Sequence, residues 1–211
     1  MSAINFNEKG YFVDPNGKPI YIVGINYVPS YAFTNFWDRW NPEIIDKDLK
    51  RISEWGLNAI RIYFFWRHNE PQPGIYNPVF FDQFDTFLKL SKKYGLYVMP
   101  CFLCHYSEGD CDIPWRNERP FWSGEMLDIA ANHLKHFVKR YKDEEQILLW
   151  DIFDEPEFSS RIKHGAEQLP YDMNVMANWV KAMYDAVKSI DPNHMVTLDL
   201  GILQTCTTVC M

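Results

Sequence analysis

Five short runs of apolar residues alternate with amphipathic stretches along most of the chain, and this alternation limits the folds that are open to it. Each run is nearly continuous in apolar side chains, as in strands that are covered on both faces. The runs are IYIVGIN (20–26), LNAIRIYFF (57–65), LYVMPCFL (96–103), ILLWDIF (147–153) and HMVTLDL (194–200). Strands that are separated by helices form parallel, right-handed crossovers. The sequence therefore predicts an α/β fold with a parallel sheet.

The stretches between these runs have apolar residues at helical spacing. In the first of them, Ile45, Leu49 and Ile52 recur at intervals of three or four residues. Gly56 and Gly95 follow the first two stretches at the position where a left-handed helix cap is wanted. We therefore expect helices over residues 42–56, 79–95, 125–141 and 173–190.

Two architectures fit this pattern, an open doubly wound sheet and a closed barrel. The turn after the first run, GINYVPS, has no G-x-G-x-x-G phosphate fingerprint, and this favours the barrel. A whole barrel has eight strands and typically about 250 residues. The expected fold is therefore a (β/α)8 TIM-barrel type, of which these 211 residues supply about the first five strands and four helices.

A short β-hairpin is expected ahead of the barrel. Residues 14–17 read DPNG and lie between two short apolar runs, which is a strong turn signal. There is no repeat, low-complexity tract or linker-like stretch, so residues 1–211 are expected to form a single domain.

The charge and hydropathy of the chain exclude several partners. Its formal net charge is −7, whereas a nucleic-acid surface needs a clustered excess of Lys and Arg. No window reaches the roughly 18 apolar residues of a membrane span, and the N-terminus lacks a basic start followed by an apolar run. We expect no nucleic-acid or membrane partner. The location is left open: the chain as it stands is typical of the cytoplasm, and a form from which a leader was removed would be secreted.

Two of the five cysteines, Cys101 and Cys104, have a spacing that occurs in metal sites. They lie within the apolar run YVMPCFLCHY, where buried free thiols are common. The thiol interpretation is favoured, so we expect neither a metal nor a cofactor.

Polar and aromatic residues stand at the ends of four successive predicted strands. This position is informative because the catalytic groups of barrels lie at the carboxyl ends of the strands. In chain order the residues are Asn26 and Tyr27, then Arg61, Tyr63 and Trp66, then His105 and Tyr106, and finally Asp154 and Glu155. The sequence predicts a site at this face of the barrel.

Taken together, these motifs resemble clan A of the retaining glycoside hydrolases, especially its cellulase and β-mannanase family. The resemblance is carried by WDIFDEPE at the fourth strand, GLNAIRI on the second, GINYVPS on the first and a His just past the third. The loop WRHNEPQPGIY also resembles the W-x-x-x-E-P-x-x-G-x-Y loop of β-galactosidases in that clan. The resemblance implies a retaining β-glycosidase that acts on a β-linked oligo- or polysaccharide: β-mannan, β-glucan or β-galactoside.

The resemblance also implies roles for individual residues. Glu155 would be the general acid/base, since a carboxyl walled by apolar neighbours has a raised pKa and can protonate a leaving oxygen near neutral pH. Arg61 would hold the nucleophile ionised, and His105 would line the cleft with Tyr106. The other substrate-binding candidates are Asn26, Tyr27, Tyr63 and three sugar platforms, Trp66, Trp115 and Trp122.

Two features depart from the family pattern. Asp154 stands where the family has an Asn that donates a hydrogen bond to the sugar 2-hydroxyl. An ionised Asp only accepts, and its charge raises the pKa of a neighbouring acid, so activity would be weakened or shifted toward acid. Retention also needs a second carboxylate about 5–5.5 Å from the first. In the clan this nucleophile is a Glu on a seventh strand, and Glu70, a loop residue before a proline, is a poor substitute.

Two classes of function are therefore left open. One is a glycoside hydrolase that further polypeptide completes. The other is a catalytically inactive half-barrel relic that binds carbohydrate or self-associates. A five-stranded open barrel would expose apolar strand edges and helix faces, which soluble monomers avoid. This predicts either self-association or further C-terminal polypeptide.

Overall fold

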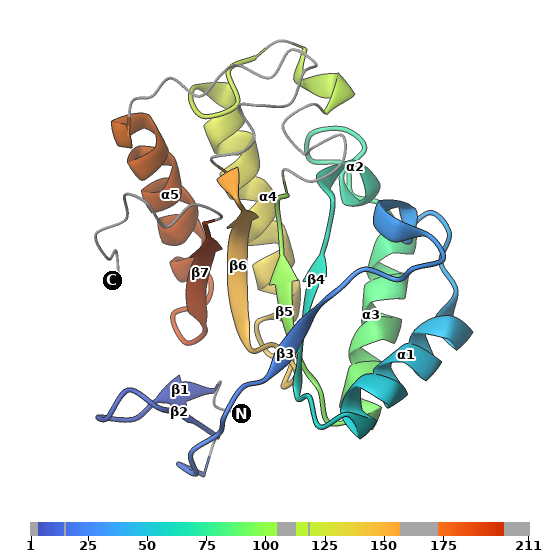
Figure 1. Ribbon diagram of the computed structural model, residues 1–211. Helices are drawn as coiled ribbons and strands as arrows, with labels where there is room; N and C mark the ends of the chain where they lie inside the picture. Colours follow the sequence, from blue (N-terminus) through green and yellow to red (C-terminus); the bar gives the residue numbers. More distant parts are fainter. Residues whose placement is uncertain (1–3, 15, 105–112, 118, 157–172, 201–211) are drawn as a thin grey trace.

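A parallel five-stranded sheet forms the centre of the computed structural model, which describes residues 4–14, 16–104, 113–117, 119–156 and 173–200 (Figure 1). Its strands pair in chain order, as in the first part of a barrel. They are β3 (Gly24–Tyr27), β4 (Ala59–Tyr63), β5 (Tyr97–Cys101), β6 (Leu149–Asp154) and β7 (Met195–Asp199). The predicted barrel-type fold and the predicted strands are confirmed, each strand being shorter than the apolar run that indicated it.

Helices connect successive strands and lie beside the sheet in Figure 1. They are α1 (Pro42–Glu54), α2 (Trp66–Asn69), α3 (Pro78–Lys93), α4 (Glu125–Tyr141) and α5 (Met173–Lys188), with 3-10 turns at Phe33–Asn35 and Pro114–Arg116. The side chains of Asn41 and Asn77 cap α1 and α3, and a proline follows each cap. None of the described helices has the length and apolar character needed to span a bilayer.

The register of the sheet separates two sets of side chains. Asn26 pairs with Arg61, and Tyr63 pairs with Cys101, which in turn pairs with Asp151. Because successive side chains of a strand point to opposite faces, the residues between these polar ones face the helices. Ile60, Ile62, Val98, Trp150 and Ile152 accordingly belong to the main apolar core.

The amino-terminal ribbon differs from the expected hairpin. Strands β1 (Asn5–Phe6) and β2 (Phe12–Val13) pair around residues 7–10, where no turn was predicted. The DPNG stretch makes a second turn, in which Val13 bridges Pro19 and the Gly17 N–H donates to Asp14 O. Ile4 joins a small apolar cluster with Ala59, Leu148 and Leu149. The ribbon therefore packs at the amino ends of β4 and β6.

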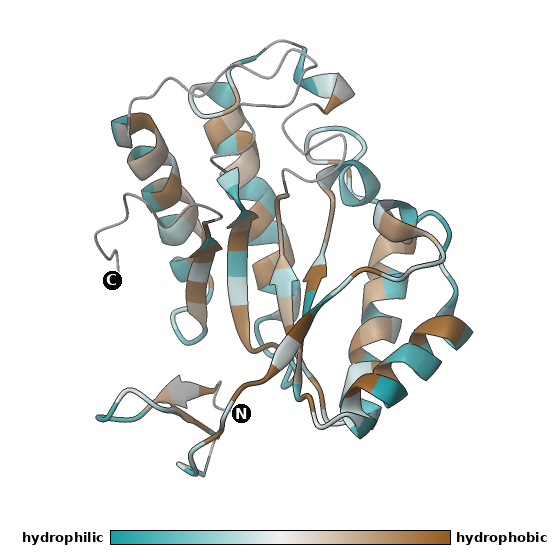
Figure 2. Ribbon diagram, in the orientation of Figure 1, coloured by the Kyte–Doolittle hydropathy of each residue, from teal (hydrophilic) through white to brown (hydrophobic). Residues whose placement is uncertain are grey.

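The segment that leads into β3 is largely hydrophobic (Figure 2), and β3 itself contributes Ile25. β3 forms one edge of the described sheet. Ile25 in β3 is 37% exposed, and Tyr21 and Val23, just ahead of the strand, are 86% and 43% exposed. An apolar edge of this kind is a surface that proteins usually cover.

Candidate active site

Arg61, in the middle of β4, is the centre of a buried polar cluster. Its Nε donates to Asp151 Oδ2 at 2.7 Å, and its Nη1 donates to Asp154 Oδ1 at 2.7 Å and to Asp199 Oδ2 at 3.0 Å. Nη1 also lies 3.0 Å from the hydroxyl of Tyr63. One guanidinium therefore joins three strands, β4, β6 and β7, and reaches the last residue of β6 and of β7.

Asp151 is the most deeply buried acid of this cluster. Burial raises the pKa of Asp151 to about 7, while the neighbouring Arg61 opposes the shift. Only Oδ2 contacts Arg61, and Oδ1 has no hydrogen-bond partner among the described residues. The charge of Arg61 is thus offset by a carboxylate that is itself costly to ionise.

Both described cysteines are free thiols that contribute to the same cluster. The Sγ of Cys104 donates to Asp154 Oδ2 at 3.3 Å, and the Sγ of Cys101 donates to Leu103 O at 3.2 Å. Burial raises the pKa of Cys101, so its thiol stays protonated. Within the described ranges, no group of three His, Cys, Asp or Glu side chains is arranged to hold a metal ion.

Glu155 follows β6 directly and is partly buried. Its φ is 49°, a left-handed conformation that costs a non-glycine residue on the order of 1 kcal/mol. The other non-glycine residues with positive φ in the described chain are Phe33, Phe65 and Asn117. Phe65 lies two residues past the end of β4, so two of these four strained residues stand close behind the carboxyl ends of strands, Phe65 after β4 and Glu155 after β6.

The structure brings some of the predicted site residues together and leaves others apart. Asp154 and Tyr63 contact Arg61, and Asn26 is exposed in register with it. The buried position of Tyr27 contradicts the prediction that it contacts substrate. It is buried on the helix side of β3, where its hydroxyl donates to Asp48 Oδ2 at 3.0 Å. The two cleft candidates His105 and Tyr106 lie outside the described residues.

The three tryptophans that were expected to be sugar platforms are buried, and this corrects the prediction. Trp66 is 0% exposed and its Nε1 donates to Glu70 Oε2 at 2.6 Å. Trp115 donates to the main-chain oxygen of Glu70, and Trp122 packs on Phe153. A ring that is enclosed by protein has no face for a sugar, so all three act in packing here.

Glu70 is also a packing residue, so it cannot serve as a substitute nucleophile. It is 1% exposed; its Oε1 accepts from the Gly74 N–H at 2.6 Å, and its Oε2 lies 2.8 Å from His133 Nδ1. Burial alone would raise the pKa of Glu70, but these contacts with His133, Gly74 and Trp66 lower it. Glu70 thus fixes the loop after β4 against α4.

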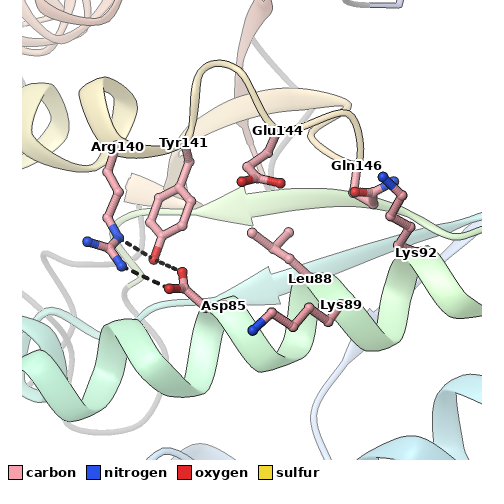
Figure 3. A pocket seen from close by; sticks show the side chains of 8 residues that line it. All are labelled: Asp85, Leu88, Lys89, Lys92, Arg140, Tyr141, Glu144 and Gln146. Atoms are coloured by element: carbon pink, nitrogen blue, oxygen red, sulfur yellow. Dashed lines mark hydrogen bonds and ion pairs between the residues drawn. The ribbon is translucent and has the colours of Figure 1, made fainter.

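A groove of about 400 Å³ lies on the helical layer, lined by side chains that Figure 3 shows. Its lining comes from the second half of α3 and from residues 140–146, which precede β6, so it lies toward the amino ends of the strands. Arg140 and Tyr141 both bond to Asp85 across it, at 2.8 and 2.7 Å. These contacts join α3 to α4 and are not part of the candidate site.

Asp151 and Asp199 were not identified from the sequence, although each left a signal there. Asp151 interrupts the apolar run LLWDIF, and Asp199 interrupts the run TLDL. A carboxylate inside a strand that is covered on both faces needs a partner, and for the fully buried Asp151 this partner is Arg61. The half-exposed Asp199 pairs with the same guanidinium.

The fold and site together define a class of protein: a (β/α) barrel with an acid at the carboxyl ends of its strands, beside a buried Arg–Asp cluster. Within this class, residues 13–203 match the family model described as Cellulase (glycosyl hydrolase family 5). The chain belongs to this family.

Several relatives share its sequence over most of its length. Mannan endo-1,4-beta-mannosidase 5 of Solanum lycopersicum is 26% identical over 231 aligned residues, which cover 94% of this chain and 52% of the relative. Mannan endo-1,4-beta-mannosidase 7 of Arabidopsis thaliana is 26% identical over 217 residues, with 91% and 48% covered. The chain spans about half the length of these curated relatives.

Solved structures show the same fold. The exo-beta-1,4-mannosidase Op5Man5 from Opitutaceae bacterium strain TAV5 superimposes with a TM-score of 0.81 at 21% identity, covering 93% of this chain and 35% of that one. The endo-1,4-beta-mannanase from Rhizomucor miehei gives a TM-score of 0.74 at 19% identity, with 94% and 61% covered. At these identities the comparison establishes the fold alone.

Proposed function

We propose that this chain carries the acid/base part of a retaining β-glycosidase site that cleaves β-1,4-linked mannan or manno-oligosaccharides. Glu155 is the general acid/base. It protonates the leaving oxygen in the first step and takes a proton from water in the second, as retention requires.

The observation that carries this proposal is the position of Glu155. It stands directly after β6 with a strained backbone, and its neighbour Asp154 is bound to Arg61. Strain of this kind persists where the surrounding structure imposes it, and it is concentrated at functional sites. The partly buried setting suits an acid that must be protonated near neutral pH.

The choice of mannan among the β-linked glycans depends on the relatives. Those reported above are mannan endo-1,4-beta-mannosidases by name, and the two solved structures of similar fold are named an exo-beta-1,4-mannosidase and an endo-1,4-beta-mannanase. β-Glucan and β-galactoside remain compatible with the motifs at the strand ends, so they are the alternatives that the test must separate.

The second carboxylate belongs to the same proposal. By family resemblance it is a Glu on a seventh strand, so the activity is proposed for a protein with the whole barrel. The edge formed by β3, with its exposed Val23 and Ile25, supports the related proposal that further polypeptide of the barrel covers it. Self-association through this edge, as in an inactive relic, is the competing outcome.

A panel of aryl β-mannosides, β-glucosides and β-galactosides, together with β-1,4-mannan, tests the proposal on the full natural protein. We expect turnover of mannan and of the mannoside well above that of the other two glycosides. Release of a product with retained anomeric configuration, followed by proton NMR, identifies the mechanism. Binding of mannan without turnover would favour the relic, and preference for a glucoside or galactoside would overturn the substrate assignment.

A further inference from the structure

Asp199, the last residue of β7, makes two different contacts with the candidate site. Its main-chain oxygen accepts the N–H of Glu155 at 3.1 Å, and its carboxylate accepts from Arg61 Nη1 at 3.0 Å. It also pairs with Asp154 in the register between β6 and β7. One residue therefore contacts the backbone of the proposed acid and the cation beside it.

The hydrogen bonds of Arg61 show why the second contact matters. Nη1 carries two hydrogens, and three oxygens lie within 3.0 Å of it: those of Asp154, Asp199 and the Tyr63 hydroxyl. Burial raises the pKa of Tyr63, so its hydroxyl keeps its proton and cannot act as a third anion. The orientation of Nη1 is thus fixed mainly by carboxylates from two adjacent strands.

Exposure distinguishes these two carboxylates. The side chain of Asp154 is 8% exposed, whereas that of Asp199 is 46% exposed. Among the described carboxylates that contact Arg61, Asp199 is therefore the most accessible to solvent or to a ligand at the strand ends. Its negative charge adds to that of Asp154 next to Glu155, and a like charge favours the protonated form of a nearby acid.

We propose that Asp199 is a positioning residue for the reaction at Glu155. It holds the guanidinium of Arg61 through its carboxylate and the Glu155 backbone through its carbonyl, and its charge helps to keep the acid protonated. This inference rests on the proposed function of Glu155. Among the described residues, the titratable side chains of this cluster are Arg61 on β4, Asp151 and Asp154 on β6 and Asp199 on β7, with Tyr63, Cys101 and Cys104 beside them.

The test compares Asp199→Asn, Asp199→Glu and Asp185→Asn in the full natural protein. Asp185 is a matched control, because it is a half-exposed Asp on α5 that pairs only with Lys181 in the described residues. For Asp199→Asn we expect kcat to fall roughly tenfold while KM stays within about twofold, since an interaction that positions the reacting groups is lost. The alkaline limb of kcat/KM, which reports the proton on the general acid, should move to lower pH.

Asp199→Glu restores the charge and should recover the position of the alkaline limb. A purely structural role would lower the melting temperature of Asp199→Asn without moving this limb. Unchanged kcat and pH profile in Asp199→Asn would overturn the proposal.

A second measurement needs no turnover. In protein labelled with 15N-arginine, the side-chain signal of Arg61, assigned by its loss in Arg61→Lys, should shift in Asp199→Asn and stay in place in Asp185→Asn. An unshifted Arg61 signal would overturn the positioning role whether or not the protein hydrolyses glycosides. If the wild-type protein hydrolyses no glycoside but the Arg61 signal still shifts in Asp199→Asn, the proposed function is contradicted and the contact between Asp199 and Arg61 is established.

Discussion

Replacing Arg61 by methionine should destabilise the protein strongly, and the size of the effect follows from its partners. Arg61→Met leaves the carboxylates of Asp151 and Asp154, which are 0% and 8% exposed, without their cation. Removing one partner of a buried ion pair typically costs about 3–5 kcal/mol. Total stability is typically only about 5–15 kcal/mol. With a urea m-value of about 2 kcal/mol per M, the unfolding midpoint should fall by roughly 1.5–2.5 M at pH 7.

The effect of Arg61→Met should shrink as the pH is lowered. The folded pKa of Asp151 is raised from its ordinary 3.8 to about 7. Stability linked to this group is therefore fully present below pH 4 and is lost as the pH rises toward 7. Without Arg61 the charged form of Asp151 is still less favourable, so more folding stability is lost at neutral pH. At pH 4 Asp151 is neutral in the folded protein and needs no cation.

Urea unfolding followed by tryptophan fluorescence at pH 4.5 and pH 7 measures both quantities. Arg140→Met is the control, because its pair with Asp85 is exposed by 46% and 34% and such pairs contribute about 1 kcal/mol or less. Equal midpoint shifts for the two variants, or a larger effect of Arg61→Met at the lower pH, would refute this account of the cluster.

Two further predictions concern other carboxylates. Glu70→Gln should lower the melting temperature at pH 7, because the charge-assisted contacts to His133, Trp66 and Gly74 are weakened. Because the folded pKa of Glu70 is lowered, the melting temperatures of wild type and Glu70→Gln should differ above pH 4.5, the ordinary pKa, and converge as the pH falls through the folded pKa. A difference in melting temperature that stays constant from pH 3 to pH 7 would contradict this account. Asp154→Asn should lower kcat for mannan hydrolysis, as Asp199→Asn should, because a neutral amide holds Arg61 Nη1 more weakly than the carboxylate does. A kcat that is kept or raised in steady-state assays would show that donation by the amide to a sugar hydroxyl outweighs the contact with Arg61.

The succession of strands and helices could be predicted because buried strands and amphipathic helices leave different periodicities. Which face a strand residue occupies was harder to predict. Tyr27 directly follows Asn26 at the end of β3, yet only the register with Arg61 shows that Asn26 faces the site and that Tyr27 faces α1. A run that is apolar throughout gives no alternation from which to choose a face.

The burial of Trp66 could not be predicted because it depends on a local backbone conformation and on distant partners. Phe65 has a φ of 47°, and α2 begins at Trp66, which packs against Trp115 and His133. The link between Glu70 and His133 spans 63 residues and was equally hidden. By contrast, the resemblance through WDIFDEPE predicted the family correctly, because the motif joins a buried strand to the carboxylates at its end.

The role of Glu155 is tested most directly by the dependence of Glu155→Gln on the leaving group. General acid catalysis typically contributes about 10²–10⁴-fold. In the full natural protein, Glu155→Gln should therefore slow mannan hydrolysis by at least about 10²-fold. It should leave formation of the glycosyl-enzyme from an activated aryl β-mannoside, seen as a burst of released phenol, much less affected. Glu54→Gln, an exposed α1 residue paired with Lys50, should behave as wild type. Equal rates of mannan hydrolysis in Glu155→Gln and wild type would contradict the assignment of Glu155 as the acid.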